Sequence, residues 1–155
     1  MNARGLGDHN KRVQVFSWLH NKSANILFLQ ETHSTATGVN NWKDDWGNNR
    51  VFFSHGTSNS TGVAILFTDN LDVEITKEYN DDEGRIVVLD VIINNENITL
   101  VNIYGPNIDN PEFFDNISFI LRDFVCETIV WGGDFNCVQD VLIDKKGGRP
   151  QTFSY

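Results

Sequence analysis

The sequence predicts an α+β domain whose strands pair mostly antiparallel. Apolar residues at helical spacing lie near the amino terminus and again after residue 110, and short β-type runs fill the region between them. A polar turn at residues 94–97 separates two of these runs and is typical of a hairpin between neighbouring strands. Helices therefore bracket a strand-rich centre, which favours an α+β fold.

Two helices are expected, and each has a recognisable start. Residues 11–21 carry Val15 and Leu19 four positions apart, and Asp8 is suited to cap this helix. The second helix is predicted to begin at Pro111, because proline is favoured in the first helical turn. Its expected apolar face consists of Phe113, Ile117, Ile120, Leu121 and Phe124.

The expected strands are short runs of apolar, β-branched and aromatic residues. Residues 25–29 form a continuous apolar run, which indicates a strand buried on both faces. Six further strands are predicted, at residues 51–54, 63–67, 73–76, 85–93, 98–104 and 128–131. Gly132 and Gly133 are expected to break the last strand, because glycine weakens a strand interior.

Composition narrows the class of protein. The chain has 155 residues, 40% of them hydrophobic, which is ordinary for one soluble globular domain. Cys126 and Cys137 lack metal-ligand spacing, so we expect small buried hydrophobes rather than a disulfide or zinc ligands. No apolar run approaches the ~18 residues of a membrane span, and no signal peptide is evident. We therefore expect an intracellular protein, nuclear or cytoplasmic, that is neither secreted nor bound to a membrane.

The charge balance argues against a free-standing nucleic-acid-binding protein. Lysine and arginine total 12 against 21 aspartate and glutamate residues, which gives a net charge of −9. Proteins that bind duplex DNA normally present a basic surface, because neutralising phosphates supplies much of the affinity.

Polar residues occur where predicted buried strands end. Glu31 follows the first strand, Tyr104 ends the sixth, and Asp134 and Asn136 follow the last. Strand ends hold side chains rigidly while the loops beyond leave them accessible. Two carboxylates with neutral oxygen partners suit magnesium, which takes few protein ligands and keeps several waters.

Taken singly, each of these residues has a simpler interpretation. A glutamate after a strand is usually a solvated loop residue, and a Gly-Gly-Asp sequence is most often a turn. The YGPN sequence at residues 104–107 is also typical of a β-turn. The functional interpretation depends on finding these motifs together and in order.

Five motifs in order resemble the superfamily that contains deoxyribonuclease I, the apurinic endonucleases and retrotransposon endonucleases. They are NARGL at residues 2–6, LQETH at 29–33, GVAIL at 62–66, YGPN at 104–107 and GGDFN at 132–136. The QETH form and DKKGG at residues 144–148 are similar to the LINE-type, non-LTR branch. The resemblance implies part of a four-layer α/β/β/α sandwich and hydrolysis of a phosphodiester with Mg²⁺, with Mn²⁺ as an alternative.

The resemblance also implies roles for seven residues. These are metal binding for Glu31 and Asn2, catalysis for Asp134, Asn136 and Tyr104, and substrate contacts for Asn107 and His33. Charge developing on phosphoryl oxygens would then meet a metal ion and fixed hydrogen-bond donors.

Three features differ from the family pattern. Only Met1 precedes Asn2, where the family has an apolar strand, and Arg4 stands where apurinic endonucleases carry an acidic residue. The chain stops at Tyr155, before the family's terminal Asp-His pair. We therefore expect residues 1–155 to be an incomplete domain, truncated at both ends and lacking its carboxyl-terminal part.

Three functional interpretations remain open from the sequence. The first is the DNA-nicking endonuclease of a retrotransposon, inactive as this fragment, with DNA and a reverse-transcriptase region of the same polyprotein as partners. The second is a non-catalytic remnant or binding module, which the acidic balance favours. The third is a superfamily phosphatase or phospholipase acting on smaller phosphate esters, against which QETH and DKKGG weigh.

Overall fold

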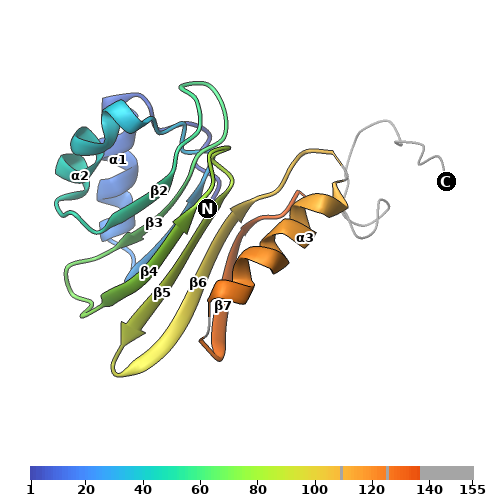
Figure 1. The fold of residues 1–155 in the computed structure, drawn as a ribbon. Helices are drawn as coiled ribbons and strands as arrows, with labels where there is room; N and C mark the ends of the chain where they lie inside the picture. Colours follow the sequence, from blue (N-terminus) through green and yellow to red (C-terminus); the bar gives the residue numbers. More distant parts are fainter. Residues whose placement is uncertain (109, 125, 137–155) are drawn as a thin grey trace, which may run out of the picture.

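Two β-sheets packed face to face form the centre of the computed structural model, which describes residues 1–108, 110–124 and 126–136 (Figure 1). The first sheet has the strand order β1–β3–β2, and both of its pairings are antiparallel. Its strands are β1 (Ile26–Gln30), β2 (Val51–Ser54) and β3 (Val63–Phe67). Every residue of the central strand β3 is buried, because helices cover one face of this sheet and the second sheet covers the other.

The second sheet has four strands in the order β4–β5–β6–β7. They are β4 (Glu74–Asn80), β5 (Ile86–Ile93), β6 (Glu96–Tyr104) and β7 (Thr128–Asp134). The β5–β6 hairpin turns at Asn94 and Asn95, whose φ angles of 52° and 63° are favourable for asparagine and match a two-residue turn. The last pairing, of β6 with β7, is parallel.

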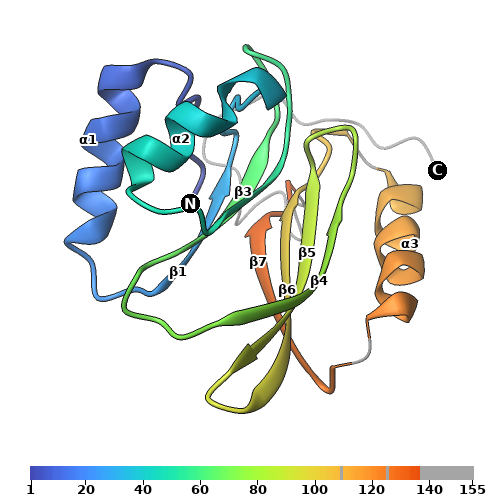
Figure 2. The same ribbon diagram turned by 60° about the vertical axis from the view of Figure 1, so that its left-hand side comes forward.

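Helices cover both outer faces and complete four layers (Figure 2). On the three-stranded sheet lie α1 (His9–His20), a short 3₁₀ turn η1 (Ala36–Gly38) and α2 (Val39–Trp46). On the four-stranded sheet lie α3 (Pro111–Ile120) and the 3₁₀ turn η2 (Leu121–Asp123). The Asp8 side chain accepts from the Lys11 backbone N–H at 2.8 Å and so caps α1 as expected.

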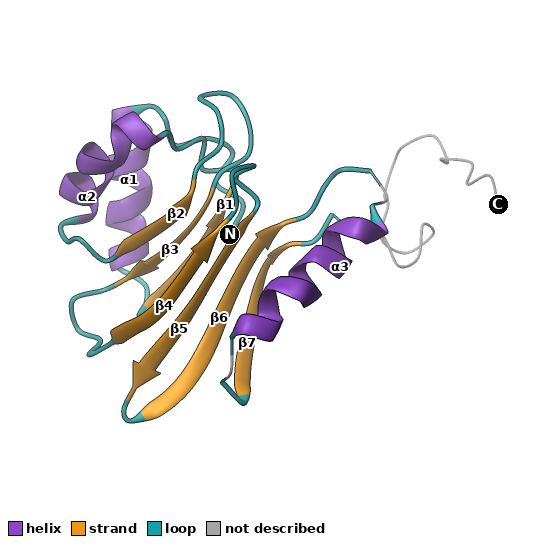
Figure 3. Cartoon of the chain, viewed as in Figure 1, coloured by secondary structure: helices purple, strands orange, loops and turns teal. Residues whose placement is uncertain are grey.

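The predicted fold class is confirmed, since the structure has two mostly antiparallel sheets between outer helices (Figure 3). Helix α2 was not predicted, because its sequence is mostly polar and only Trp42 and Trp46, four apart, bury against the sheet. The expected break at Gly132 and Gly133 is wrong: β7 continues through both glycines to Asp134, paired with β6 along its whole length.

Two other expectations concern cysteines and membranes. Cys126 is only partly buried, and burial raises the pKa of its thiol. Cys137 and the DKKGG sequence at residues 144–148 lie outside the described residues. No helix within the described ranges is long and apolar enough to cross a membrane.

Strand β7 exposes an apolar surface. Ile129, Val130 and Trp131 retain 42%, 44% and 43% of their accessible surface. Beside them lies an apolar groove of about 500 Å³ between the two sheets, to which Phe28 and Leu100 also contribute. Exposed apolar strands at a sheet edge favour association with other chains.

We predict that the chain self-associates through β7. Trp131→Lys should lower the concentration-dependent increase in mass measured by sedimentation velocity, because a charge on the strand opposes edge-to-edge pairing. Trp18→Lys on α1 is the matched control, since Trp18 is 51% exposed but lies away from the sheet edges. Equal association of the two variants would contradict the prediction.

Candidate active site

The predicted polar residues lie where β1, β6 and β7 end. Strands β6 and β7 run in the same direction, and Tyr104 at the end of β6 is directly paired with Asp134 at the end of β7. Glu31 follows β1 in the opposing sheet. The structure brings Tyr104 and Glu31 together across the two sheets, because the tyrosine hydroxyl donates to Glu31 Oε1 at 2.7 Å.

The carboxylate of Glu31 is held in its charged form. Its pKa lies below the ordinary value, chiefly because the Tyr104 hydroxyl donates to it and then because the Asn2 amide does. Partial burial opposes this effect, and smaller electrostatic interactions with His33 and Arg4 add to it. A carboxylate that stays ionised is suited to a cation.

Asp134 is held by Asn2, a residue that also acts on Glu31. Asn2 Nδ2 donates to Asp134 Oδ2 at 3.1 Å, and the Asn2 side chain is the second cause that lowers the pKa of Glu31. Asn2 therefore interacts with a carboxylate from each side of the site. Asp134 Oδ1 accepts in turn from the Asn136 backbone N–H at 3.2 Å.

Asn2 is fixed in place by the segment around it. Ala3 N donates to Gln30 O and Gly5 N to Glu31 O, both at 2.7 Å, so the amino-terminal segment runs beside the end of β1. Arg4 N donates to Asn2 Oδ1 at 3.0 Å. This bond uses one of the two lone pairs of the Asn2 amide oxygen and directs the amide nitrogen toward Asp134.

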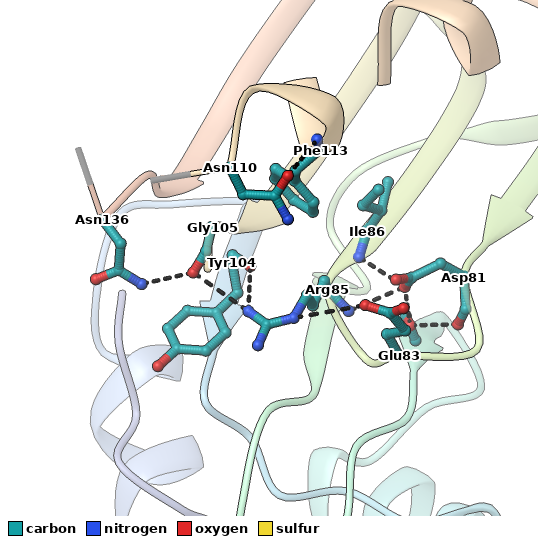
Figure 4. Close-up of polar contacts among 10 residues, drawn as sticks. Asp81, Glu83, Arg85, Ile86, Tyr104, Gly105, Asn110, Phe113 and Asn136 are labelled. Carbon is teal, nitrogen blue, oxygen red and sulfur yellow. Dashed lines mark hydrogen bonds and ion pairs between the residues drawn. The ribbon is translucent and has the colours of Figure 1, made fainter. Parts of the chain in front are cut away.

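Asn136 is connected to Tyr104 through the backbone that follows β6 (Figure 4). Its Nδ2 donates to Gly105 O at 2.7 Å. Arg85 donates to the same carbonyl at 3.2 Å and to Tyr104 O at 3.1 Å, with its guanidinium 5.4 Å from the centre of the Tyr104 ring. Asp81 accepts from the backbone N–H of Arg85 at 2.9 Å.

Arg85 is therefore a contributor that the motifs did not indicate. An arginine at the head of an otherwise apolar strand is the one signal in the sequence that could have drawn attention to it.

Backbone conformations that are unusual for non-glycine residues gather at this site. Seven described non-glycine residues have positive φ angles, and four of them belong here: Arg4 (49°), Glu31 (51°), His33 (55°) and Asn136 (49°). Such conformations cost of order 1 kcal/mol or more each and persist where the surrounding structure enforces them. Their clustering points to a site with imposed geometry.

The two expected substrate contacts lie at the edge of this group. His33 is half-buried, and a Cβ on Gly5 would come within 2.7 Å of its Nδ1, so the glycine leaves room for the imidazole. Asn107 is exposed in the loop after β6, three residues from Tyr104, and takes no part in the hydrogen bonds described above. The structure brings His33 into the group and leaves Asn107 outside it.

Gly132 sets the spacing between the sheets beside the site. A Cβ at this position would lie 2.0 Å from Cδ2 of Phe28 on β1, which is impossible without displacement. Gly132 therefore allows the Phe28 ring to lie directly on β7, two residues before Asp134. The sequence suggested a turn here and gave no indication of this contact.

The donor set fits a hydrated magnesium ion. Glu31 and Asp134 supply two carboxylates, and neither forms an ion pair with a lysine or arginine side chain among the described residues. That part of the chain holds no group of three or more His, Cys, Asp or Glu side chains placed to bind a metal. One or two carboxylates suffice for Mg²⁺, which retains several waters, whereas zinc sites normally need three or four protein ligands.

The fold and the site together define a class: four-layer α/β/β/α sandwiches with a polar, carboxylate-bearing centre at one end of the sheets. The chain belongs to the Endonuclease/Exonuclease/phosphatase family, whose model matches residues 1–141. It is also 32% identical over 143 residues to the Transposon TX1 uncharacterized 149 kDa protein of Xenopus laevis. That match covers 90% of this chain and 11% of the relative, so the chain spans about a tenth of the curated relative's length.

Solved structures share the fold of this chain. The AP endonuclease LMAP from Leishmania major matches with a TM-score of 0.69 and 16% identity, over 95% of this chain and 57% of that one. The endonuclease domain of TRAS1, a telomere-specific non-LTR retrotransposon, matches with a TM-score of 0.58 and 19% identity, over 90% and 59%. At these identities the likeness establishes the fold alone.

We predict that Glu31→Gln lowers the pKa of Tyr104. Burial raises that pKa first, and the hydrogen bond and charge of Glu31 raise it further. Removing the charge should bring the pKa down but leave it above the ordinary tyrosine value, because the burial remains. Site-resolved NMR titration would measure the change, and Tyr79 on β4 serves as the unaffected control. An unchanged Tyr104 pKa would contradict the contact.

We also predict that Gly132→Ala destabilises the chain by about 1–3 kcal/mol, because overpacking displaces Phe28. Urea unfolding would measure the loss. Phe28→Leu should recover part of it in the Gly132→Ala background, since neighbouring changes are not additive. Gly7→Ala is the matched control, because a Cβ there would meet nothing within 4 Å.

Proposed function

We propose that this chain is the metal- and phosphate-binding part of a Mg²⁺-dependent endonuclease domain that nicks DNA. The observation that carries the proposal is the pair of hydrogen bonds at the strand ends, from Tyr104 Oη to Glu31 Oε1 at 2.7 Å and from Asn2 Nδ2 to Asp134 Oδ2 at 3.1 Å. Hydrolysis of a phosphodiester requires a cation and fixed donors around the phosphoryl group. In this arrangement the carboxylates would hold the cation, and Tyr104 and Asn136 would supply the donors.

The relatives support a retrotransposon origin. One is a transposon protein of 149 kDa, and another is described as the endonuclease domain of a non-LTR retrotransposon. On this basis we propose DNA as the substrate of the intact parent protein and a reverse-transcriptase region of the same polyprotein as its partner. The acidic balance, a net charge of −9, predicts weak DNA binding by this chain alone.

Each site residue has a distinct part in the proposed reaction. Glu31 and Asn2 would hold Mg²⁺, or Mn²⁺ as an alternative, and the ion would neutralise charge on the phosphoryl oxygens when bound. The Asp134 carboxylate, which accepts hydrogen bonds from Asn2 and Asn136, would accept a proton from an attacking water.

Tyr104 and Asn136 would stabilise the phosphoryl group. The raised pKa of Tyr104 keeps its hydroxyl protonated, so that it can donate to Glu31 or to a phosphoryl oxygen. Asn136 uses one amide hydrogen on Gly105 O, which leaves the second for a phosphate oxygen. His33 and Asn107 would contact the substrate backbone from the edge of the site.

Three of the four histidines have partners outside the candidate site, so they are not available as a general acid for the proposed reaction. His9 pairs with Asp45, His20 stacks on Trp46, and His55 hydrogen-bonds Ser34. Only His33 lies in the site. We propose that residues 1–155 are an incomplete domain and that efficient nicking needs the Asp-His pair implied by the family resemblance.

The negative net charge of the chain favours a second candidate function, hydrolysis of a smaller phosphate ester. A net charge of −9 is less unfavourable for a phosphatase or phospholipase acting on a smaller phosphate ester than for a protein that binds a long polyanion. A non-catalytic remnant that binds only a divalent ion would be equally compatible with that charge.

We predict no measurable nicking of supercoiled plasmid by the 155-residue chain with Mg²⁺. A version extended through the family's Asp-His pair should nick, and Glu31→Ala or Asp134→Ala should lower its rate by about 10²–10³ or more, as expected for groups acting on the transition state. Glu96→Ala is the matched control, because this exposed carboxylate lies in the β5–β6 hairpin at the other end of β6.

Each outcome selects one interpretation. Nicking by the 155-residue chain as fast as by the extended one would show that the Asp-His pair is dispensable, and His33→Ala would then test the replacement. An extended protein that hydrolyses a small phosphate ester but not DNA would favour the second candidate. An extended protein that binds Mg²⁺ without any hydrolysis would favour the remnant.

A further inference from the structure

Two buried amides join the sheets immediately behind the candidate site. Gln30 at the end of β1 and Asn102 in β6 are 1% and 0% exposed. Gln30 Nε2 donates to Asn102 Oδ1 at 2.7 Å, across the space between the sheets. The neighbouring side chains in this layer are apolar, among them Val63, Ile65 and Leu100.

The hydrogen bonds of Asn102 allow one orientation only. Its Nδ2 donates to Leu29 O at 3.0 Å and to Ala64 O at 2.9 Å, so both amide hydrogens are used on the opposing sheet. A reversed amide would place its oxygen against these two carbonyl oxygens. Oδ1 of Asn102 must therefore face Gln30, and the Gln30 amide must be oriented so that its Nε2 donates to that oxygen.

Hydrophobic packing does not require this polar pair. Burying an amide is unfavourable unless it is hydrogen-bonded, and replacing two bonded polar partners with apolar groups of similar shape is often nearly neutral. The aliphatic and phenylalanine side chains of this layer pack between the sheets without polar contacts. What the amide pair adds is a fixed relative position of two strands.

That position matters because the pair lies next to the site in both strands. Gln30 directly precedes Glu31, and Asn102 lies two residues before Tyr104, on the same face of β6. The next contact between the sheets in this direction is the bond from Tyr104 Oη to Glu31 Oε1, at 2.7 Å. Glu31 also has a φ of 51°, a strained conformation that needs a firm anchor before it.

We infer that Gln30 and Asn102 are positioning residues that set Glu31 opposite Tyr104 and thereby shape the metal-binding end of the site. The inference rests on the proposed function for its importance in catalysis. Its structural part concerns only the contact between Tyr104 and Glu31 and can be tested without substrate.

The test compares Gln30→Met with Val91→Ala in the full 155-residue chain. Gln30→Met keeps the length of the side chain but removes the N–H group that donates to Asn102. Val91→Ala perturbs the same layer between the sheets, but near the end of β5 that lies away from the candidate site. The chain has three tyrosines, so ¹³Cζ-labelled tyrosine gives a simple NMR spectrum in which Tyr104→Phe assigns the Tyr104 signal. The spectrum of Glu31→Ala gives the chemical shift of the Tyr104 signal when the hydrogen bond to Glu31 is absent.

We expect Gln30→Met to shift the Tyr104 signal toward its Glu31→Ala position, and Val91→Ala to leave it unchanged. Mn²⁺ affinity, measured by water proton relaxation, should fall on the order of 10-fold in Gln30→Met and remain unchanged in Val91→Ala. A Tyr104 signal and Mn²⁺ affinity in Gln30→Met that match Val91→Ala would overturn the inference.

Two further outcomes are also decisive. If Gln30→Met does not fold, Gln30→Asn replaces it, because the shorter amide remains polar but cannot reach Asn102. Failure of both to fold while Val91→Ala folds would overturn the inference, since the pair would then maintain the fold rather than the site. If the parent chain binds no Mn²⁺, the proposed metal assignment fails, while the Tyr104 signal still decides the role of the amide pair.

Discussion

Close approach of the two sheets at the ends of β1, β6 and β7 is the constraint on which the candidate site depends. Glu31 comes from one sheet and Tyr104 and Asp134 from the other, so the bond from Tyr104 Oη to Glu31 Oε1 would be lost if the sheets were separated further. Gly132 permits that approach by leaving room for Phe28. Parallel pairing of β6 and β7 then places Tyr104 beside Asp134.

The polar groups divide between two tasks within this arrangement. Asn2 and Tyr104 hold carboxylates by hydrogen bonds and keep Glu31 charged. Arg85 and Asn136 hold the backbone after β6, where both donate to Gly105 O. Substitutions of Asn2 or Tyr104 should therefore change the ionisation of the carboxylates. Substitutions of Arg85 or Asn136 should change the position of the backbone after β6.

The sequence was sufficient for features that leave a local pattern. The strands of the second sheet follow β-type runs, and Glu31, Tyr104 and Asp134 could be named because the motifs that contain them occur together and in the order of a known family. Asn102 could not be named, since an asparagine within an apolar run carries no sign of a partner 72 residues away. Helix α2 was missed for a related reason: its two buried tryptophans are too few to give helical periodicity.

The bond between Asn2 and Asp134 joins residues 132 positions apart, almost the full length of the described chain. Contacts between such distant residues form late, because the entropy of closing a long loop must be offset by structure already present. During synthesis the amino-terminal segment emerges long before β7 exists. A ribosome-bound or partly folded chain therefore lacks the contact between Asn2 and Asp134, and the geometry of the candidate site exists only once the sandwich has closed.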